Sequence, residues 1–363
     1  MTKRDIANLR LANQQISAGE LASPKDLVYR MGALQAQDFR SVKWAIGLRI
    51  PGCTADVVDK AIDDGDIIRT HVLRPTWHFV SPGDLAWMLD LSAPKIMPSL
   101  KYRQDFLGLK PEILSRSNEI IAKSLKGRQS GREEIAASLK SEGIELRTGG
   151  DTVENRLSHI LLWAELSGII CSGKTSRDKQ TYALISERIP AGKKPARKEA
   201  LGMLASKYFK SHGPATLKDF GWWSGLSSGD IRTALEIAGD ELESTEIDSV
   251  KYWYGKTQQP ANDVKRAWLI PAFDEIIISY TDRSALMSSD NHGKAVSSNG
   301  IFRPVLIVDN LVAGLWKTVK AKDRLIVEIT SFRSLKKQEK KLIEEAAEAY
   351  GSFTGLKTEV KYT

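Results

Sequence analysis

The order of the predicted secondary-structure elements constrains this fold most, because three helices followed by a two-stranded hairpin recur along the chain. In the middle of the chain, Ser130 and Gly131 precede a helix with acidic residues in its first turn. A second helix begins near Thr152, and its apolar residues return at the spacing of one helical face. Strands over 169–171 and 181–184 follow, joined by a turn rich in Gly, Ser and Lys. This order is typical of a winged helix, a relative of the helix-turn-helix.

The same order is predicted on both sides of this middle segment. At the N-terminal end, helices are expected over 5–15, 23–34, 41–48 and from Thr54, before a hairpin over 67–71 and 76–80. On the C-terminal side, helices over 195–209, 216–223 and 227–238 precede a hairpin over 243–247 and 251–254. We therefore predict three winged-helix units in tandem.

A different pattern begins after Gln258-Gln259-Pro260, which has the composition of a boundary. Strands are predicted over 267–270, 276–279, 305–308, 311–317 and 324–330, followed by a helix over 335–350 and a last strand over 357–362. The expected fold class is α+β, with three tandem winged-helix units and a small β-rich C-terminal domain. The predicted domains are 1–110 (first unit with extra helices), 111–192 (second unit), 193–258 (third unit) and 259–363 (the C-terminal domain).

Composition narrows the class of protein. The chain carries 53 Lys+Arg against 45 Asp+Glu, a net charge of +8, with a pI near 9.2. This fits a polyanionic partner, and it fits a slightly basic soluble surface equally well. No apolar run is long enough to span a bilayer, and residues 1–10 lack the apolar core of a signal peptide. With only Cys53 and Cys171, no disulfide framework is expected, so a cytoplasmic location is predicted.

Basic residues concentrate in the predicted wing of the middle unit and the linker after it. Residues 172–198 hold eight Lys or Arg, including Lys174, Arg177 and Lys179, against two acidic residues. Such a wing can lie along a phosphate backbone, and each neutralised phosphate releases counterions. The alternative is a solvated, lysine-rich loop. The basic run over 333–341 is interpreted instead as the solvated side of an amphipathic helix.

Sequence signatures of metal, dinucleotide or nucleotide-phosphate binding are absent, so no metal and no cofactor are expected. Two polar segments stand out. One is the Gln35-Ala36-Gln37 segment, at the predicted end of an apolar helix. The other is the hairpin over 69–80, which contains two Arg, two His and a Trp. Without further information, the glutamines are better described as polar helix-end caps and the hairpin as a structural wing.

These segments carry a resemblance to a known family. The sequence resembles the winged-helix DNA glycosylases of the AlkZ/YcaQ type over nearly its whole length. The similarity lies in the two segments above and in two others, Asp219-Phe220-Gly221-Trp222-Trp223-Ser224-Gly225 and Leu269-Ile270-Pro271-Ala272-Phe273-Asp274-Glu275 followed by Tyr280, Asp282 and Arg283. The order and spacing of these motifs are more specific than any one of them.

The resemblance implies tandem winged helices that shape a DNA channel, and excision of bulky alkylated purines, in some members from interstrand crosslinks. It implies that Gln35 and Gln37 are catalytic, since Gln-x-Gln is the motif of the AlkZ-like branch. Asp38 is one residue out of register for the other branch, and Pro75 stands where the family more often has Gly. The expected DNA contacts are Arg69, His71, Arg74, Trp77, His78, Lys174, Arg177 and Lys179. Trp77 is equally well interpreted as a core anchor.

The chemistry of the proposed substrate is compatible with a neutral catalytic motif. An N7- or N3-alkylated purine is already cationic and therefore a good leaving group. A glutamine carbonyl can accept a hydrogen bond from the attacking water, and its dipole can support developing positive charge. The runner-up is a non-enzymatic winged-helix DNA-binding protein, and a weaker third interpretation is an RNA- or nucleoprotein-associated scaffold. Several winged units in one chain favour a monomer on double-stranded DNA, associated with the nucleoid and not with a membrane.

Overall fold

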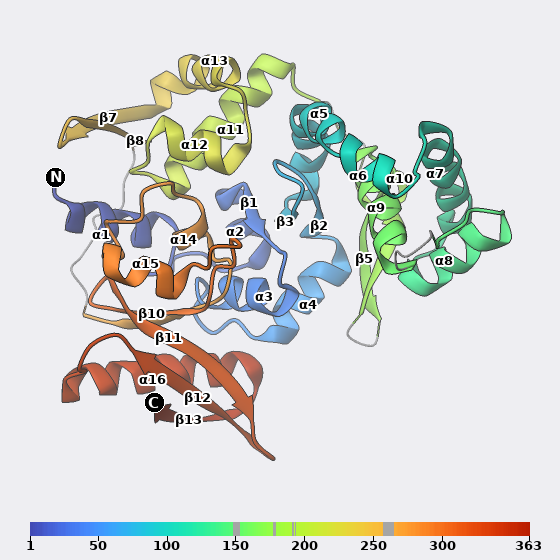
Figure 1. Cartoon of the computed structure of the whole chain (residues 1–363). Helices are drawn as coiled ribbons and strands as arrows, with labels where there is room; N and C mark the ends of the chain where they lie inside the picture. Colours follow the sequence, from blue (N-terminus) through green and yellow to red (C-terminus); the bar gives the residue numbers. More distant parts are fainter. Residues whose placement is uncertain (148–152, 177–178, 191, 193, 257–264) are drawn as a thin grey trace. The chain divides into compact units, whose positions relative to one another are not determined.

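The computed structural model describes residues 1–147, 153–176, 179–190, 192, 194–256 and 265–363 (Figure 1). The chain divides into two compact units. Unit 1 comprises residues 1–58 and 201–363, and unit 2 comprises residues 59–200. Unit 1 therefore contains both ends of the chain, whereas the sequence suggests four consecutive domains. The predicted boundary at 258–260 lies outside the described residues.

Unit 2 contains a helix-rich segment and two hairpins. Its elements are β2 (Ile68–His71), β3 (Trp77–Val80), α5 (Pro82–Ser99), α6 (Lys101–Phe106), α7 (Pro111–Leu125), β4 (Ser130–Gly131), α8 (Arg132–Ser141), α9 (Val153–Leu166), β5 (Ile170–Ser176), β6 (Lys179–Leu184) and α10 (Ile185–Arg188). Helix α4 (Ala55–Asp64) begins in unit 1 and ends in unit 2, and α11 (Arg197–His212) begins in unit 2 and ends in unit 1.

The hairpins of unit 2 confirm the predicted strands. In β2 and β3, Ile68 lies opposite Val80 and His71 lies opposite Trp77. Strands β5 and β6 pair antiparallel, and the short β4 adds to β6, so the sheet order is β4-β6-β5. Helices α7, α8 and α9 and this sheet enclose one apolar cluster, because their apolar faces meet.

Unit 1 holds the remaining elements. They are α1 (Lys3–Asn13), α2 (Pro24–Met31), β1 (Ala33–Gln35), α3 (Phe39–Gly47), α12 (Leu217–Ser224), α13 (Ser228–Ala238), the 3-10 turn η1 (Gly239–Glu241), β7 (Leu242–Ile247), β8 (Val250–Gly255), β9 (Ala267–Ile270), α14 (Glu275–Ile278), α15 (Ser289–Ala295), β10 (Val305–Val308), β11 (Leu311–Lys320), β12 (Arg324–Ser331), α16 (Lys337–Thr354) and β13 (Lys357–Tyr362).

One element order appears in both units. In residues 111–184 it is helix, short strand, helix, helix and hairpin. Residues 197–255 repeat it, with Ala215 forming the short bridge to Trp253 of β8. In both cases the short segment pairs with the second strand of the hairpin. The elements α2, β1, α3, α4, β2 and β3 follow the same order along the sequence.

The C-terminal part of unit 1 is a five-stranded sheet of order β13-β12-β11-β10-β9. All its neighbours are antiparallel except β12 and β13, which α16 connects as a crossover helix. The C-terminal helix α16 also packs on α3, where the Trp44 ring lies 5.0 Å from Tyr350 and 5.2 Å from Phe353. This long-range packing joins the predicted C-terminal domain to the N-terminal segment in one unit.

Two predicted elements are wrong. The predicted strand at 276–279 is the short helix α14, which Asp274 caps by accepting from the Ile276 N–H at 2.9 Å. A short, fully buried apolar run does not distinguish a strand from a helix by periodicity. The helix predicted to 34 ends at Met31, because Gly32 has φ +77° and turns the chain into β1. Gln35 is therefore on a strand and not at a helix end.

Arg49 and Asp274 form a buried ion pair in unit 1. Both guanidinium NH₂ groups donate to the Asp274 carboxylate at 2.8 Å, and neither side chain is exposed. The same guanidinium donates to the backbone of Gln14 at 2.9 Å and to that of Ala45 at 2.8 Å. It therefore connects α1, α3 and the start of α14.

Among the described residues, no helix is both long and apolar enough to cross a membrane.

We expect Arg49→Ala to lower the free energy of unfolding by roughly 3–5 kcal/mol, because it leaves the Asp274 charge buried without its partner. The measurement is urea denaturation followed by circular dichroism. The matched control is Lys210→Ala, which removes an exposed pair with Glu241 (2.6 Å) and should change stability by less than about 1 kcal/mol. Equal, small effects of the two variants would contradict this role of the buried pair.

Candidate functional site

The Gln35-Ala36-Gln37 segment connects β1 to α3. Gln35 is half-buried, Ala36 is fully buried and Gln37 is exposed. This alternation is typical of an extended chain, in which residues two positions apart point to the same side. Asp38 follows as the N-cap of α3, and its carboxylate accepts from the N–H groups of Arg40 (3.0 Å) and Ser41 (2.9 Å). The glutamine segment is therefore fixed at its C-terminal end by a helix cap.

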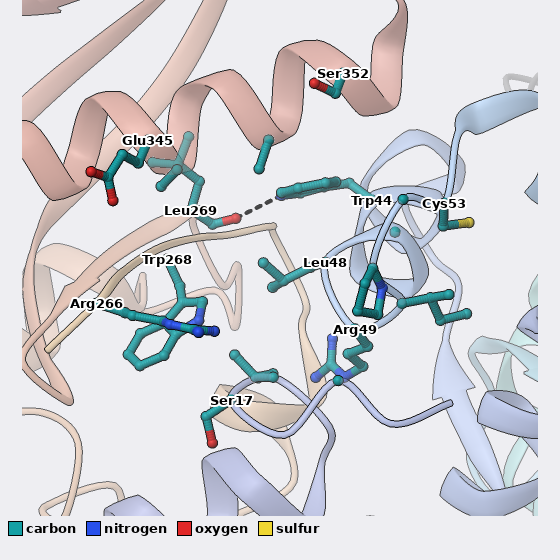
Figure 2. Close-up of a pocket in the computed structure, with 18 of the residues that line it drawn as sticks. Ser17, Trp44, Leu48, Arg49, Cys53, Arg266, Trp268, Leu269, Glu345 and Ser352 are labelled. Carbon is teal, nitrogen blue, oxygen red and sulfur yellow. Dashed lines mark hydrogen bonds between the residues drawn. The ribbon is translucent and has the colours of Figure 1, made fainter. Parts of the chain in front are cut away.

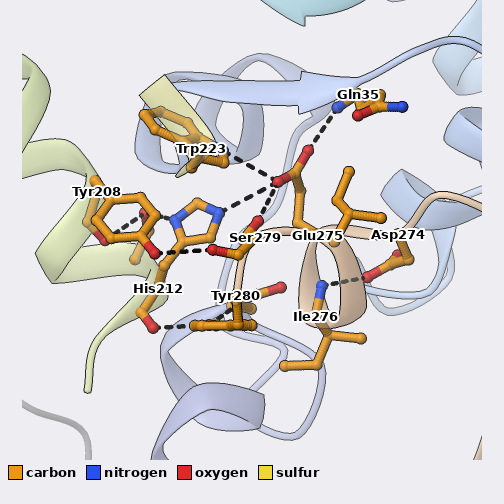
Figure 3. A network of polar contacts seen from close by, with 12 residues as sticks. Gln35, Tyr208, His212, Trp223, Asp274, Glu275, Ile276, Ser279 and Tyr280 are labelled. Atoms are coloured by element: carbon orange, nitrogen blue, oxygen red, sulfur yellow. Dashed lines mark hydrogen bonds and ion pairs between the residues drawn. The ribbon is translucent and has the colours of Figure 1, made fainter. Parts of the chain in front are cut away.

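A buried carboxylate fixes the other end of the segment. Glu275, the first residue of α14, accepts a hydrogen bond from the Gln35 backbone N–H at 2.6 Å. The side-chain amide of Gln35 points away from this carboxylate (Figure 3). Glu275 is 1% exposed, so this contact lies in the protein interior. The buried Glu275 carboxylate therefore fixes the backbone of β1 at Gln35.

Neutral donors surround the Glu275 carboxylate (Figure 3). The Trp223 indole N–H donates to it at 3.1 Å, and the Ser279 hydroxyl donates to the same oxygen. His212 Nε2 lies 3.7 Å from that oxygen. His212 ends α11, Trp223 lies in α12 and Ser279 follows α14, so three helices meet at one carboxylate.

The charge states follow from burial and hydrogen bonding. Burial raises the pKa of Glu275, but the contacts from His212, Ser279 and the Gln35 N–H outweigh burial and hold the pKa at about 2. Burial lowers the pKa of His212, although Glu275 opposes the shift. At neutral pH the carboxylate is therefore ionised and the imidazole is neutral.

Aromatic side chains pack against this network and form hydrogen bonds with it. The Tyr208 and His212 rings stack with centroids 4.8 Å apart, and the Tyr208 hydroxyl donates to the Ser279 carbonyl at 3.0 Å. The Tyr280 hydroxyl donates to the His212 carbonyl at 2.7 Å and accepts from the Gln14 side chain at 2.9 Å. Few of these groups have rotational freedom, so the backbone of β1 is held in one position.

Two exposed aromatic side chains and a half-buried lysine lie on the helices next to β1. Tyr29 of α2 is 57% exposed, and the Lys207 ammonium lies 3.4 Å from its ring centroid. Trp222 of α12 is 48% exposed, although its indole N–H donates to the Ile278 carbonyl at 2.8 Å. Such side chains suit stacking and charge contacts with a nucleic acid.

The hairpin residues predicted to contact DNA have partners within unit 2. His71 is buried and bonded to Glu165 of α9, and its ring lies 4.5 Å from that of Trp77. The Arg69 guanidinium lies 4.4 Å from the centroid of the Trp77 ring, and the backbone N–H of Arg69 donates to the Ser172 hydroxyl at 2.8 Å.

Trp77 is half-buried and packs between two predicted DNA contacts. His78 is buried, and Arg74 is half-buried. Contacts of the five hairpin residues with DNA stay a prediction.

The wing residues are more accessible. Lys174 and Lys179 are exposed on β5 and β6, and Lys179 forms a pair with the exposed Glu133 at 3.4 Å. Arg177 lies outside the described residues. The wing lysines belong to unit 2, and the two glutamines belong to unit 1.

Sequence reasoning missed Glu275, His212 and Trp223. Glu275 and Trp223 lie in the quoted motifs, but nothing in their spacing links them to Gln35. One signal was available, because the charged pair Asp274-Glu275 is enclosed by apolar residues on both sides. Charged side chains in such a run are either exposed or paired in the interior.

A cavity of about 710 Å³ lies elsewhere in unit 1, between the loop after α3, the start of β9 and α16 (Figure 2). Its lining includes Trp44, whose indole N–H donates to the Leu269 carbonyl at 2.7 Å, and Arg49, which Asp274 already binds. Cys53 also lines it, and burial raises the pKa of this thiol, which disfavours the nucleophilic thiolate. The two glutamines are not among the lining residues.

No group of three or more His, Cys, Asp or Glu that could hold a metal occurs among the described residues. The Gln35 site offers amide dipoles and a buried negative charge. Such groups can orient water and stabilise positive charge.

Comparison with known proteins relates the whole chain to one group. A family model described as DNA glycosylase AlkZ-like matches residues 28–353. An interstrand DNA cross-link repair glycosylase from Streptomyces sahachiroi is 24% identical over 372 residues, which cover 97% of this chain and 96% of the relative. The solved structure of the Streptomyces sahachiroi DNA glycosylase AlkZ has a TM-score of 0.80 at 22% identity and covers 100% of both chains. The two chains share one fold.

The neutral state of His212 predicts a pH-dependent stability. Its folded pKa lies below the ordinary value of 6.5, so the unfolded state binds more protons as the pH falls below 6.5. The stability contribution is complete above this pH and is lost as the pH decreases. We expect His212→Gln to reduce the slope of unfolding free energy between pH 7.5 and 5.5, by at most about 1.4 kcal/mol per pH unit.

The control is His292→Gln, which replaces an exposed histidine and should leave the slope as in the wild type. Some slope should remain in His212→Gln, because burial lowers the pKa of His159 to about 4. Urea denaturation at each pH measures these slopes. Identical slopes for wild type and His212→Gln would contradict the assignment.

Proposed function

Because this chain belongs to the AlkZ-like DNA glycosylase family, as the sequence resemblance predicted, we propose that it hydrolyses the N-glycosidic bond of bulky or cationic N7- or N3-alkylated purines in double-stranded DNA. The Streptomyces sahachiroi relative is named for interstrand cross-link repair, and we extend the proposal to unhooking of such links. The observation that carries it is the Gln35-Ala36-Gln37 segment, held rigidly from behind while Gln37 remains exposed.

Gln35 and Gln37 are the proposed catalytic residues. They flank the buried Ala36, and side chains two positions apart in an extended chain point to the same side. Both amides can therefore face one sugar. One carbonyl accepts a hydrogen bond from the attacking water, and the amide dipoles support positive charge on the deoxyribose. The alkylated base is already cationic, so it departs with the bonding electron pair as a neutral molecule.

We propose that the segments with the repeated element order bind DNA. We propose that the elements from α2 to β3, those within 111–184 and those within 197–255 form the three winged-helix units predicted over 1–110, 111–192 and 193–258. The exposed Lys174 and Lys179 on β5 and β6 then occupy the wing, where phosphate contacts are common. We further propose that one chain acts as a monomer in the cytoplasm, in association with the nucleoid.

We expect Gln35→Ala and Gln37→Ala to slow base release by about 10²–10³-fold, the usual cost of removing one preorganised dipole. The measurement is single-turnover release of N7-methylguanine from an alkylated duplex, with enzyme in excess. Melting temperature and affinity for undamaged DNA should stay close to wild type. Gln37→Asp installs the carboxylate of the other branch and tests whether a charged group can replace the amide.

The control for these variants is Gln338→Ala, which replaces an exposed glutamine of α16. It should release base at the wild-type rate. A wild-type protein that releases no cationic alkylpurine would refute the glycosylase proposal and favour a non-enzymatic DNA-binding protein. Alanine variants as fast as wild type would refute only the catalytic assignment.

Wing contacts predict a steep salt dependence. We expect Lys174→Ala/Lys179→Ala to weaken binding to all duplex sequences alike and to reduce the slope of log Kd against log salt by about 1–2. The control is Lys337→Ala/Lys341→Ala, which removes two exposed lysines of α16 and should leave the slope unchanged. Fluorescence anisotropy at several salt concentrations gives the slopes. Equal slopes for wild type and both double variants would exclude the proposed wing contacts.

A further inference from the structure

The charges buried in unit 1 do not cancel. Among its described residues, the buried charged side chains are Arg10, Arg49, Asp219, Asp274 and Glu275, and the buried His212 is neutral. Arg49 pairs with Asp274 at 2.8 Å, and Arg10 lies 3.9 Å from Asp219. Two guanidinium groups thus accompany three carboxylates. The remaining negative charge belongs to Glu275.

The groups that donate hydrogen bonds to Glu275 carry no formal charge. The Gln35 N–H, the Trp223 indole and the Ser279 hydroxyl surround it, and His212 lies at 3.7 Å. Burying an ion without a counter-ion is unfavourable. A glutamine at this position could accept the same hydrogen bond from Gln35 without that cost. The hydrogen bond to Gln35 alone therefore does not explain why an acid occupies this position.

The position of the Glu275 carboxylate next to β1 suggests a function for its negative charge. Glu275 accepts a hydrogen bond from the Gln35 backbone N–H, and the Gln35 side chain points away from the Glu275 carboxylate (Figure 3). The Glu275 side chain is 1% exposed, so its charge lies in the protein interior. A charge in the low-dielectric interior acts over a longer range than one in water. Its field therefore reaches the solvent side of β1.

We propose that Glu275 is a positioning residue that fixes Gln35 and makes the catalytic side of β1 electronegative, so that positive charge on the deoxyribose is stabilised as the glycosidic bond breaks. This inference rests on the proposed function. Glu275 makes no bond to the substrate. Water attacks C1′, the alkylated base leaves with the electron pair of the C1′–N9 bond, and the proton of the water passes to solvent.

The test separates charge from structure by equilibrium binding. Two duplexes of identical sequence carry one modified sugar each: a cationic pyrrolidine analogue of the deoxyribose, and a neutral tetrahydrofuran. Wild type should bind the cationic duplex more tightly, because it resembles the charged transition state. In Glu275→Gln we expect this preference to fall roughly 10- to 100-fold, with unchanged affinity for the tetrahydrofuran duplex.

Two further variants make the comparison specific. Glu275→Asp keeps the charge on a shorter side chain and should recover much of the preference for the cationic sugar. Glu241→Gln removes an exposed carboxylate of the same unit, which pairs with Lys210, and should leave the preference as in wild type. A merely structural role of Glu275 would instead lower the affinity for both duplexes together.

Base release completes the experiment. Glu275→Gln should slow single-turnover release of N7-methylguanine by the same factor by which it lowers the binding preference. A wild type that releases this base but binds both duplexes equally would overturn the inference while leaving the proposed function intact. That result needs no variant, so it decides the question even if Glu275→Gln does not fold. A wild type that releases no base would instead refute the proposed function.

Discussion

The buried acidic pair Asp274-Glu275 is the constraint on which the rest of the site depends. Asp274 caps α14 and binds Arg49, which follows α3, while Glu275 binds the backbone of Gln35 in β1. Two adjacent carboxylates thus fix the chain on both sides of the glutamine segment. Each would be costly to bury alone, and each is stabilised by partners far away in the sequence.

This arrangement explains why unit 1 contains both ends of the chain. The contacts of Asp274 and Glu275 require that residues near 35 and 49 fold together with residues near 275. The packing of α16 on α3 through Trp44, Tyr350 and Phe353 has the same effect. A preorganised site follows, because the glutamine backbone cannot move without breaking buried hydrogen bonds.

Local signals were sufficient for most of the fold. Capping residues such as Thr216 and Ser227 and alternating strands predicted α12, α13 and the three hairpins, because caps and turns depend on neighbouring residues. The prediction failed at α14, where the run Ile276–Ile278 is buried on all sides and has no periodicity to read. It also failed at β1, where the conformation of Gly32 ended a helix earlier than its apolar pattern suggested.

The sequence by itself determined the family, the order of the elements and the identity of Gln35 and Gln37 as candidates, since these reside in contiguous motifs. Only the tertiary structure decided that the segment is a strand with a buried charge behind it, and that Arg69 and His71 have partners inside unit 2. The physical reason is that burial and pKa depend on which distant side chains surround a group. Glu275, Trp223 and His212 meet through folding and share no local sequence pattern.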